Sequence, residues 1–123
     1  MSQDEAIMDS ALANEFADHW IAAWNQHDLE KILSHYTNDF EMSSPVIVEA
    51  MKVPSGTLKG KDKVRAYWSK ALQNYPDLKF EKLHVLTGSS SVTIIYNGVR
   101  GLSAESFHFN RSGKVHAAFA HYL

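Results

Sequence analysis

Cysteine is absent from this sequence of 123 residues. Without cysteine the chain can form no disulfide and carries no thiolate nucleophile. No apolar segment approaches the roughly 20 residues that a membrane-spanning helix needs. Lysine and arginine total 12 against 14 aspartates and glutamates, which leaves a net charge of −2 and no basic surface for nucleic acid. We therefore expect neither a membrane nor a nucleic acid as a partner.

The first ten residues, MSQDEAIMDS, lack the basic and then apolar order of a signal peptide. Together with the absence of cysteine, this predicts a cytoplasmic protein. Hydrophobic residues make up 45% of the chain and charged residues 21%, which is typical of a soluble globular protein. No repeat, linker or low-complexity tract divides the sequence. We therefore expect a single domain over residues 1–123, large enough to enclose a pocket.

Hydrophobic periodicity predicts three helices, followed mainly by strands. Apolar steps of three and four residues mark the helices over residues 5–24, 28–36 and 61–75. A short strand, FEMSSP, is expected at 40–45, before an extended piece and a loop over 46–60. The turns TGSSS, NGVRG and NRSG separate the later strands, expected at 78–87, 91–99, 102–110 and 114–123. This order is typical of an α+β fold with helices packed on one face of an antiparallel sheet.

One strand carries an acidic residue among aromatic ones. In SAESFHFN, residues 103–110, a period of two places Glu105 on the same face as Phe107 and Phe109. If the two phenylalanines face the core, the pleat sends Glu105 inward as well. Burial disfavours an ionised carboxylate, so we expect Glu105 to be shielded from water and to have a raised pKa. The alternative is a frayed strand end at which Glu105 stays ionised.

Seven histidines raise the question of a metal site, but their spacing does not support one. No two histidines lie four residues apart on a helix with a glutamate between them, and no His-x-His pattern occurs. The sequence also has no Gly-x-Ser-x-Gly nucleophile motif and no glycine-rich loop for a phosphate. We therefore expect no metal and no cofactor.

The last strand, KVHAAFAHYL, indicates unfilled space in the core. Its alternation places four residues on one face: His116, Ala118, Ala120 and Tyr122. Two alanines in line beneath bulky helix aromatics leave volume that a small molecule can occupy. The helix aromatics alone are more typical of an ordinary core than of a ligand site.

Three segments carry a likeness to a known family: FADHWIAAWNQHDLEKILSHYTNDFEMSSP, GTLKGKDKVRAYWSKAL and SFHFNRSGKV. They resemble the nuclear transport factor 2-like superfamily, and more narrowly the SnoaL-like domain proteins, from about residue 10 onward. The resemblance implies a cone, in which a curved, mostly antiparallel sheet wraps around three helices and encloses an apolar pocket. Members include isomerases, dehydratases, epoxide hydrolases, polyketide cyclases and non-catalytic modules, so the fold alone does not fix an activity.

Ketosteroid isomerase is a distant relative whose hairpin aligns without gaps on ESFHFNRSGKV. This resemblance implies that Glu105 stands where the isomerase has the protonated aspartic acid of its oxyanion hole. It also places three residues on the pocket wall: Phe107, Ala118 and Ala120. Two departures count against the isomerase activity, because Trp20 replaces the hydrogen-bonding tyrosine and Ser44 replaces the catalytic base.

Two hypotheses from different classes follow. In the first, the chain is an isomerase, lyase or cyclase for a small apolar or cyclic molecule, with Glu105 as a neutral acid and His116 or His84 as the base. In the second, it is a non-catalytic binding or accessory module with Glu105 as a polar anchor. The facing of Glu41, a second candidate acid, is open. The candidate ligand-binding residues are Phe16, Trp20, Ser44, Trp68, Tyr96, Phe107, Ala118, Ala120 and Tyr122.

A homodimer is also expected. The outward faces of the final strands carry Val115, Phe119 and His108, which would form a continuous apolar patch on a monomer. The resemblance supports this by analogy, because relatives commonly pair through the same sheet surface.

Overall fold

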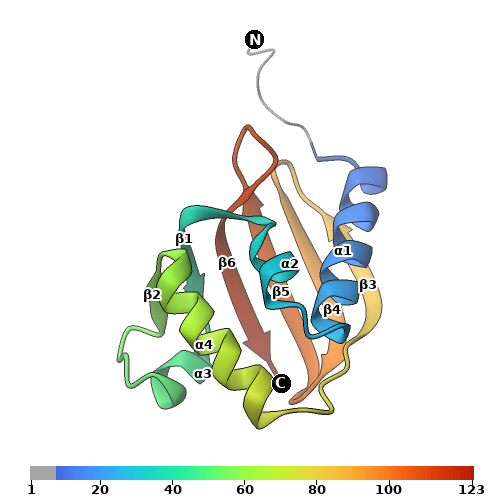
Figure 1. Cartoon of the computed structure of the whole chain (residues 1–123). Helices are drawn as coiled ribbons and strands as arrows, with labels where there is room; N and C mark the ends of the chain where they lie inside the picture. Colours follow the sequence, from blue (N-terminus) through green and yellow to red (C-terminus); the bar gives the residue numbers. More distant parts are fainter. Residues whose placement is uncertain (1–7) are drawn as a thin grey trace.

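A six-stranded, unclosed sheet curves around the helices in the computed structural model, which describes residues 8–123 (Figure 1). The strand order is β2-β1-β6-β5-β4-β3, with β1 (Tyr36–Ser43), β2 (Thr57–Lys59), β3 (Glu81–Thr87), β4 (Ser91–Gly98), β5 (Gly101–Phe109) and β6 (Val115–Tyr122). Neighbouring strands are antiparallel except β1 and β6, which are parallel. The helices are α1 (Ser10–Asn25), α2 (Leu29–Leu33), α3 (Pro45–Ala50) and α4 (Lys61–Asn74). The expected α+β fold with a curved, mostly antiparallel sheet is confirmed.

Helix α1 supplies one wall of the core. It begins at Ser10 because the Asp9 side chain caps it, accepting a hydrogen bond from the Leu12 backbone N–H at 2.8 Å. Its buried face consists of Ala13, Ala17, Trp20, Ala23 and Trp24. Leu12 has the same apolar spacing in the sequence as Phe16 and Trp20, yet it is 50% exposed, because the buried face of the helix passes through the alanines. The predicted helical residues 5–7 lie outside the described residues.

Alternation along the strands sets which residues face the helices. In β4 the inward residues are Val92, Ile94 and Tyr96, and in β5 they are Ser103, Glu105, Phe107 and Phe109. Pairing places Glu105 opposite Ile94 on one side and Ala120 on the other. The parity prediction for Glu105 and Phe107 is therefore confirmed. No helix in residues 8–123 is long and apolar enough to cross a membrane.

Two predictions between residues 34 and 60 are wrong. Tyr36 begins strand β1 instead of extending α2, because it pairs in parallel with the distant Val115, a contact that no local pattern shows. Pro45 starts helix α3, which was expected to be extended. The hydroxyl of Ser44 caps this helix by accepting a hydrogen bond from the Val46 N–H at 3.1 Å, and proline is well suited to a first helical position. The loop that follows contains the short strand β2, which pairs with β1.

The facing predicted for the start of the last strand is also wrong. Phe109 pairs with Val115 but His108 pairs with Ala117, so His116 is the extra residue of a bulge. The bulge shifts the alternation, and Val115 is fully buried whereas His116 is exposed. His116 therefore points away from the helices. Val115 does not belong to the outer surface on which a dimer was predicted.

Candidate functional site

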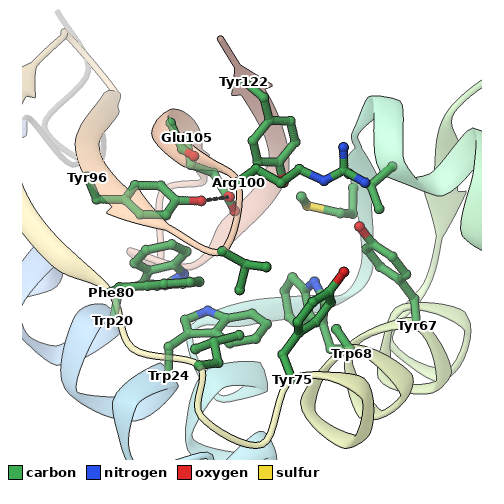
Figure 2. A pocket seen from close by; sticks show the side chains of 16 residues that line it. Trp20, Trp24, Tyr67, Trp68, Tyr75, Phe80, Tyr96, Arg100, Glu105 and Tyr122 are labelled. Carbon is green, nitrogen blue, oxygen red and sulfur yellow. Dashed lines mark hydrogen bonds between the residues drawn. The ribbon is translucent and has the colours of Figure 1, made fainter.

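A pocket opens between α1, α4 and the inner face of the sheet (Figure 2). Its volume is about 100 Å³. Its wall is mainly aromatic: Trp20, Trp24, Tyr67, Trp68, Tyr75, Phe80, Tyr96 and Tyr122. Aliphatic and small side chains complete it, namely Met42, Val46, Ala71, Leu78, Val99 and Ser103. This enclosed volume is smaller than the roughly 150 Å³ of a cavity that holds benzene, so the space admits a small molecule of at most about one ring.

Glu105 is the single carboxyl group among the residues that line the pocket. Its side chain comes from β5, and the residue is only 4% exposed. Burial raises the pKa of Glu105 to about 8, and the hydrogen bond that the Tyr96 hydroxyl donates to Oε1 at 3.4 Å opposes this rise. The expected shielding of Glu105 is confirmed, and burial shifts its pKa in the expected direction. At neutral pH the carboxyl group is mostly protonated, so it can donate a hydrogen bond into the pocket.

Tyrosine hydroxyls gather around this acid. Burial raises the pKa of each of them, and the charge of an ionised Glu105 raises it further: Tyr36, Tyr67, Tyr96 and Tyr122. The indole N–H of Trp20 donates to the Tyr36 hydroxyl at 3.0 Å beneath the pocket. The tyrosines are therefore neutral hydroxyls that can donate to or accept from a ligand.

Arg100 stands at the mouth of the pocket, in the turn between β4 and β5. Its guanidinium lies 5.7 Å from the centre of the Tyr122 ring and 3.8 Å from a carboxylate oxygen of Glu49. In Figure 2 it lies close to Tyr122, and the hydroxyl of Tyr67 points toward the same side. The open end of an otherwise apolar pocket thus carries a positive charge.

Residues at the C-terminal end of α1 fix the segment before β3, which contributes Leu78 and Phe80 to the pocket wall. The Asn25 side chain donates to the Phe80 carbonyl at 3.0 Å and accepts from the Phe80 N–H at 2.7 Å. His27 Nε2 lies 2.9 Å from the carbonyl oxygen of Leu78. These contacts fix Leu78 and Phe80 against the tryptophans of α1, although neither residue belongs to a strand or helix.

The structure separates the predicted ligand-binding residues into two groups. Those that line the pocket are Trp20, Trp68, Tyr96 and Tyr122. Those that do not are Phe16, Ser44, Phe107, Ala118 and Ala120. Phe107 is fully buried in the core with its ring 5.2 Å from that of Trp20, and Phe16 packs on it from the far side at 4.9 Å. Ser44 and Ala120 border a neighbouring surface hollow.

The candidate bases and the second acid lie outside the pocket. His116 is exposed at the bulge of β6, His84 is exposed on the edge strand β3, and Glu41 is exposed on β1. Ala118 and Ala120 do not line the pocket, so the space expected above these two alanines is not where the pocket lies. Within residues 8–123, no three histidine, aspartate or glutamate side chains are grouped so that they could hold a metal ion.

Several pocket residues were not predicted from the sequence. Ser103 shares the face of Glu105 by the same period of two, and Tyr67, Ala71 and Tyr75 belong to the apolar stripe of α4. The helical spacing of α4 and the alternation of β5 therefore could have identified these four residues. Arg100 lies in a turn, where no periodicity indicates which way a side chain points.

The model of the SnoaL-like domain matches residues 17–121 of this chain. A SnoaL-like protein of unknown function from Burkholderia thailandensis E264 is 50% identical, with a TM-score of 0.93 over 96% of this chain and 99% of its own. SalBIII, an epoxide hydrolase/cyclase-like enzyme of pyran ring formation in salinomycin, is 15% identical, with a TM-score of 0.75 over 94% and 93%. A protein with a cystatin-like fold from Methylobium petroleophilum PM1 is 14% identical, with a TM-score of 0.74 over 95% and 79%.

The search of curated proteins gives no match. The two structures of low identity show the shared fold alone, whereas the domain match covers most of the chain. This chain belongs to the SnoaL-like domain family.

Proposed function

We propose that the chain binds a small, mostly apolar cyclic molecule that carries a carbonyl oxygen, and that neutral Glu105 donates a hydrogen bond to this oxygen. The observation that carries the proposal is a single carboxyl group, 4% exposed, inside a small pocket with a mainly aromatic wall. A protonated acid in such a site has one O–H to donate. A ligand carbonyl accepts it without bringing a charge into the pocket, and it offers a stronger acceptor than the Tyr96 hydroxyl at 3.4 Å.

The same hydrogen bond supports catalysis of an isomerase, lyase or cyclase type. Negative charge develops on a carbonyl oxygen when water or a basic group of the ligand takes the proton of a neighbouring C–H bond, or when a nucleophile adds to the carbonyl. No side chain that the structure describes in the pocket, other than Glu105, is a candidate for that proton acceptor. A donor held in a water-poor site stabilises that charge more than water does. The fold shared with SalBIII, an enzyme of pyran ring formation, supports a ring-forming reaction as one of these types.

A non-catalytic binding module is the second candidate. It is favoured by the outward facing of His116, His84 and Glu41, which leaves no imidazole and no second carboxylate among the lining residues to act as a base. In this case Glu105 serves only to orient the ligand. For either candidate we propose a cytoplasmic location, on the sequence argument alone.

Binding is expected to depend on Glu105 only when the ligand has an acceptor. All three tryptophans of the chain line the pocket, so their fluorescence reports occupancy. Glu105→Leu is expected to weaken cyclohexanone binding about fivefold, as the loss of one hydrogen bond does, and to leave methylenecyclohexane nearly unchanged. Glu105→Gln retains a donor and is expected to keep the preference for the ketone. An unchanged ratio of the two affinities in Glu105→Leu contradicts the proposal.

Proton exchange separates the two candidates. In D₂O, a catalytic pocket is expected to accelerate exchange of the α-hydrogens of bound cyclohexanone, followed by NMR. Glu105→Leu, which has no donor, is expected to remove the acceleration, whereas Glu105→Gln is expected to retain part of it. A binding module leaves the rate at that of buffer although the ketone binds.

We also propose a homodimer that pairs through the outer face of the sheet. No helix within residues 8–123 covers this face, which exposes Leu86, Leu102 and Phe119. The ring of His108 lies 5.2 Å from that of Phe119. Light scattering at micromolar concentration is expected to give a dimer for the native chain and a monomer for Phe119→Asp, because a buried charge opposes pairing. Leu12→Asp on α1 is the matched control and is expected to remain a dimer. A monomeric native chain contradicts the proposal.

A further inference from the structure

Arg100 carries the one positive charge among the residues that line the pocket. Its guanidinium is held over the Tyr122 ring, 5.7 Å from the ring centre, a placement that an arginine keeps by cation–π attraction. The side chain is 47% exposed, so a ligand in the mouth can reach it. Arg100 is therefore positioned at the entrance and accessible from it.

The protein itself engages this guanidinium weakly. Its ion-pair partner Glu49 lies at 3.8 Å, beyond hydrogen-bond distance, and the Glu49 side chain is 76% exposed. A carboxylate that binds arginine well forms two parallel hydrogen bonds at about 2.8 Å. Because Glu49 is too far away for a hydrogen bond, the N–H groups of the Arg100 guanidinium remain free to donate to a stronger acceptor.

Neutral hydroxyls border the same position. The charge of Arg100 acts on the Tyr67 and Tyr122 hydroxyls, where it partly offsets the rise in pKa that burial causes. In Figure 2 the Tyr67 hydroxyl points toward the arginine. A carboxylate placed at the mouth would meet a guanidinium and hydroxyl donors, and the neutral form of Glu105 deeper in the pocket would not repel it.

We propose that the ligand is a cyclic oxo acid, whose carboxylate pairs with Arg100 at the mouth while its carbonyl oxygen accepts from Glu105 inside. The inference rests on the proposed function for the ligand's carbonyl group, which binds Glu105 (the carbonyl end). It adds a carboxylate on the same ligand, which binds Arg100 (the anionic end). Arg100 is then the residue that selects acids over neutral rings of the same shape.

The test compares 4-oxocyclohexanecarboxylate with its methyl ester by tryptophan fluorescence titration. The native chain is expected to bind the acid about tenfold more tightly than the ester, as a charge-assisted hydrogen bond allows. Arg100→Gln is expected to abolish this preference and to leave ester binding within about twofold. Glu49→Gln is expected to increase the affinity for the acid, because it removes the competing carboxylate.

Arg111→Gln is the matched control. Arg111 is an exposed arginine in the turn between β5 and β6, at the opposite end of β5 from Arg100, and its replacement changes the net charge equally. It is expected to keep the preference for the acid. Equal affinities for acid and ester in the native chain, or equal losses in the two arginine variants, overturn the inference.

The two proposals can fail separately. If Glu105→Leu weakens ketone binding but Arg100→Gln leaves the acid preference intact, the anionic end is wrong and the carbonyl end stands. If Arg100→Gln removes the preference but Glu105→Leu has no effect on the ketone, the carbonyl end is wrong and the arginine site stands.

Discussion

Glu105→Gln is expected to remove a pH-dependent loss of stability that the native chain shows between about pH 4.5 and pH 8. The pKa of Glu105 rises from its ordinary value of 4.5 to about 8 because folding buries the group. In this window the folded chain holds a proton that the unfolded chain has lost, so the free energy of unfolding falls as the pH rises. The contribution is fully present below pH 4.5 and is lost as the pH rises through 8. Its slope approaches about 1.4 kcal/mol per pH unit.

Urea unfolding at one-unit steps from pH 5 to pH 9 measures this effect. The free energy of unfolding of the native chain minus that of Glu105→Gln is expected to fall by several kcal/mol over the series and to level off above pH 8. Glu41→Gln, at an exposed glutamate of β1, is the control and is expected to give a nearly constant difference. A constant difference for Glu105→Gln as well would show that the buried acid is not held neutral by the fold.

Trp20→Ala is expected to lower the free energy of unfolding by about 4 kcal/mol. Trp20 is 1% exposed and contacts the rings of Trp24, Phe80, Tyr96 and Phe107. Its loss enlarges the pocket that it lines and also removes the N–H that donates to the buried Tyr36 hydroxyl. Trp20→Phe keeps an aromatic ring and is expected to cost less than half as much.

Chemical denaturation of the two Trp20 variants beside Leu12→Ala checks this prediction. Leu12 lies on the same helix but is half exposed, so its truncation is expected to cost less than about 1 kcal/mol. A loss below that level for Trp20→Ala would mean that the aromatic cluster can close over the missing ring.

The alternation of residues along one strand was sufficient to predict that Glu105 faces the pocket. Glu105 faces the helices because its strand alternates without interruption from Ser103 to Phe109, so one buried phenylalanine determines the facing of the others. The tryptophans of α1 and α4 followed from helical spacing in the same way. Where an element is regular, sequence parity and burial coincide.

Long-range pairing explains what the sequence did not reveal. His116 does not face the pocket because it is the extra residue of a bulge in β6, between the residues that pair with Phe109 and His108 of β5. A bulge depends on the pairing of two strands, which a single segment of sequence does not show. The local spacing of Tyr36 suits the end of a helix as well as the start of a strand, and its parallel pairing with Val115 decides for the strand. The direction of Arg100 depends on the Tyr122 ring, which lies on another strand. Each of these outcomes is decided by a partner that is remote in the sequence.

The central place of β6 in the sheet has a consequence for biosynthesis. This strand joins β1 to β5, and without it the sheet separates into β2–β1 and β5–β4–β3. While a ribosome is still making residues 115–122, β1 and β5 each present an edge with unpaired backbone groups, which is the kind of surface that joins to other chains. The two parts of the sheet can therefore form separately during synthesis, and both edges stay open until β6, the last of the six strands in the sequence, pairs with them.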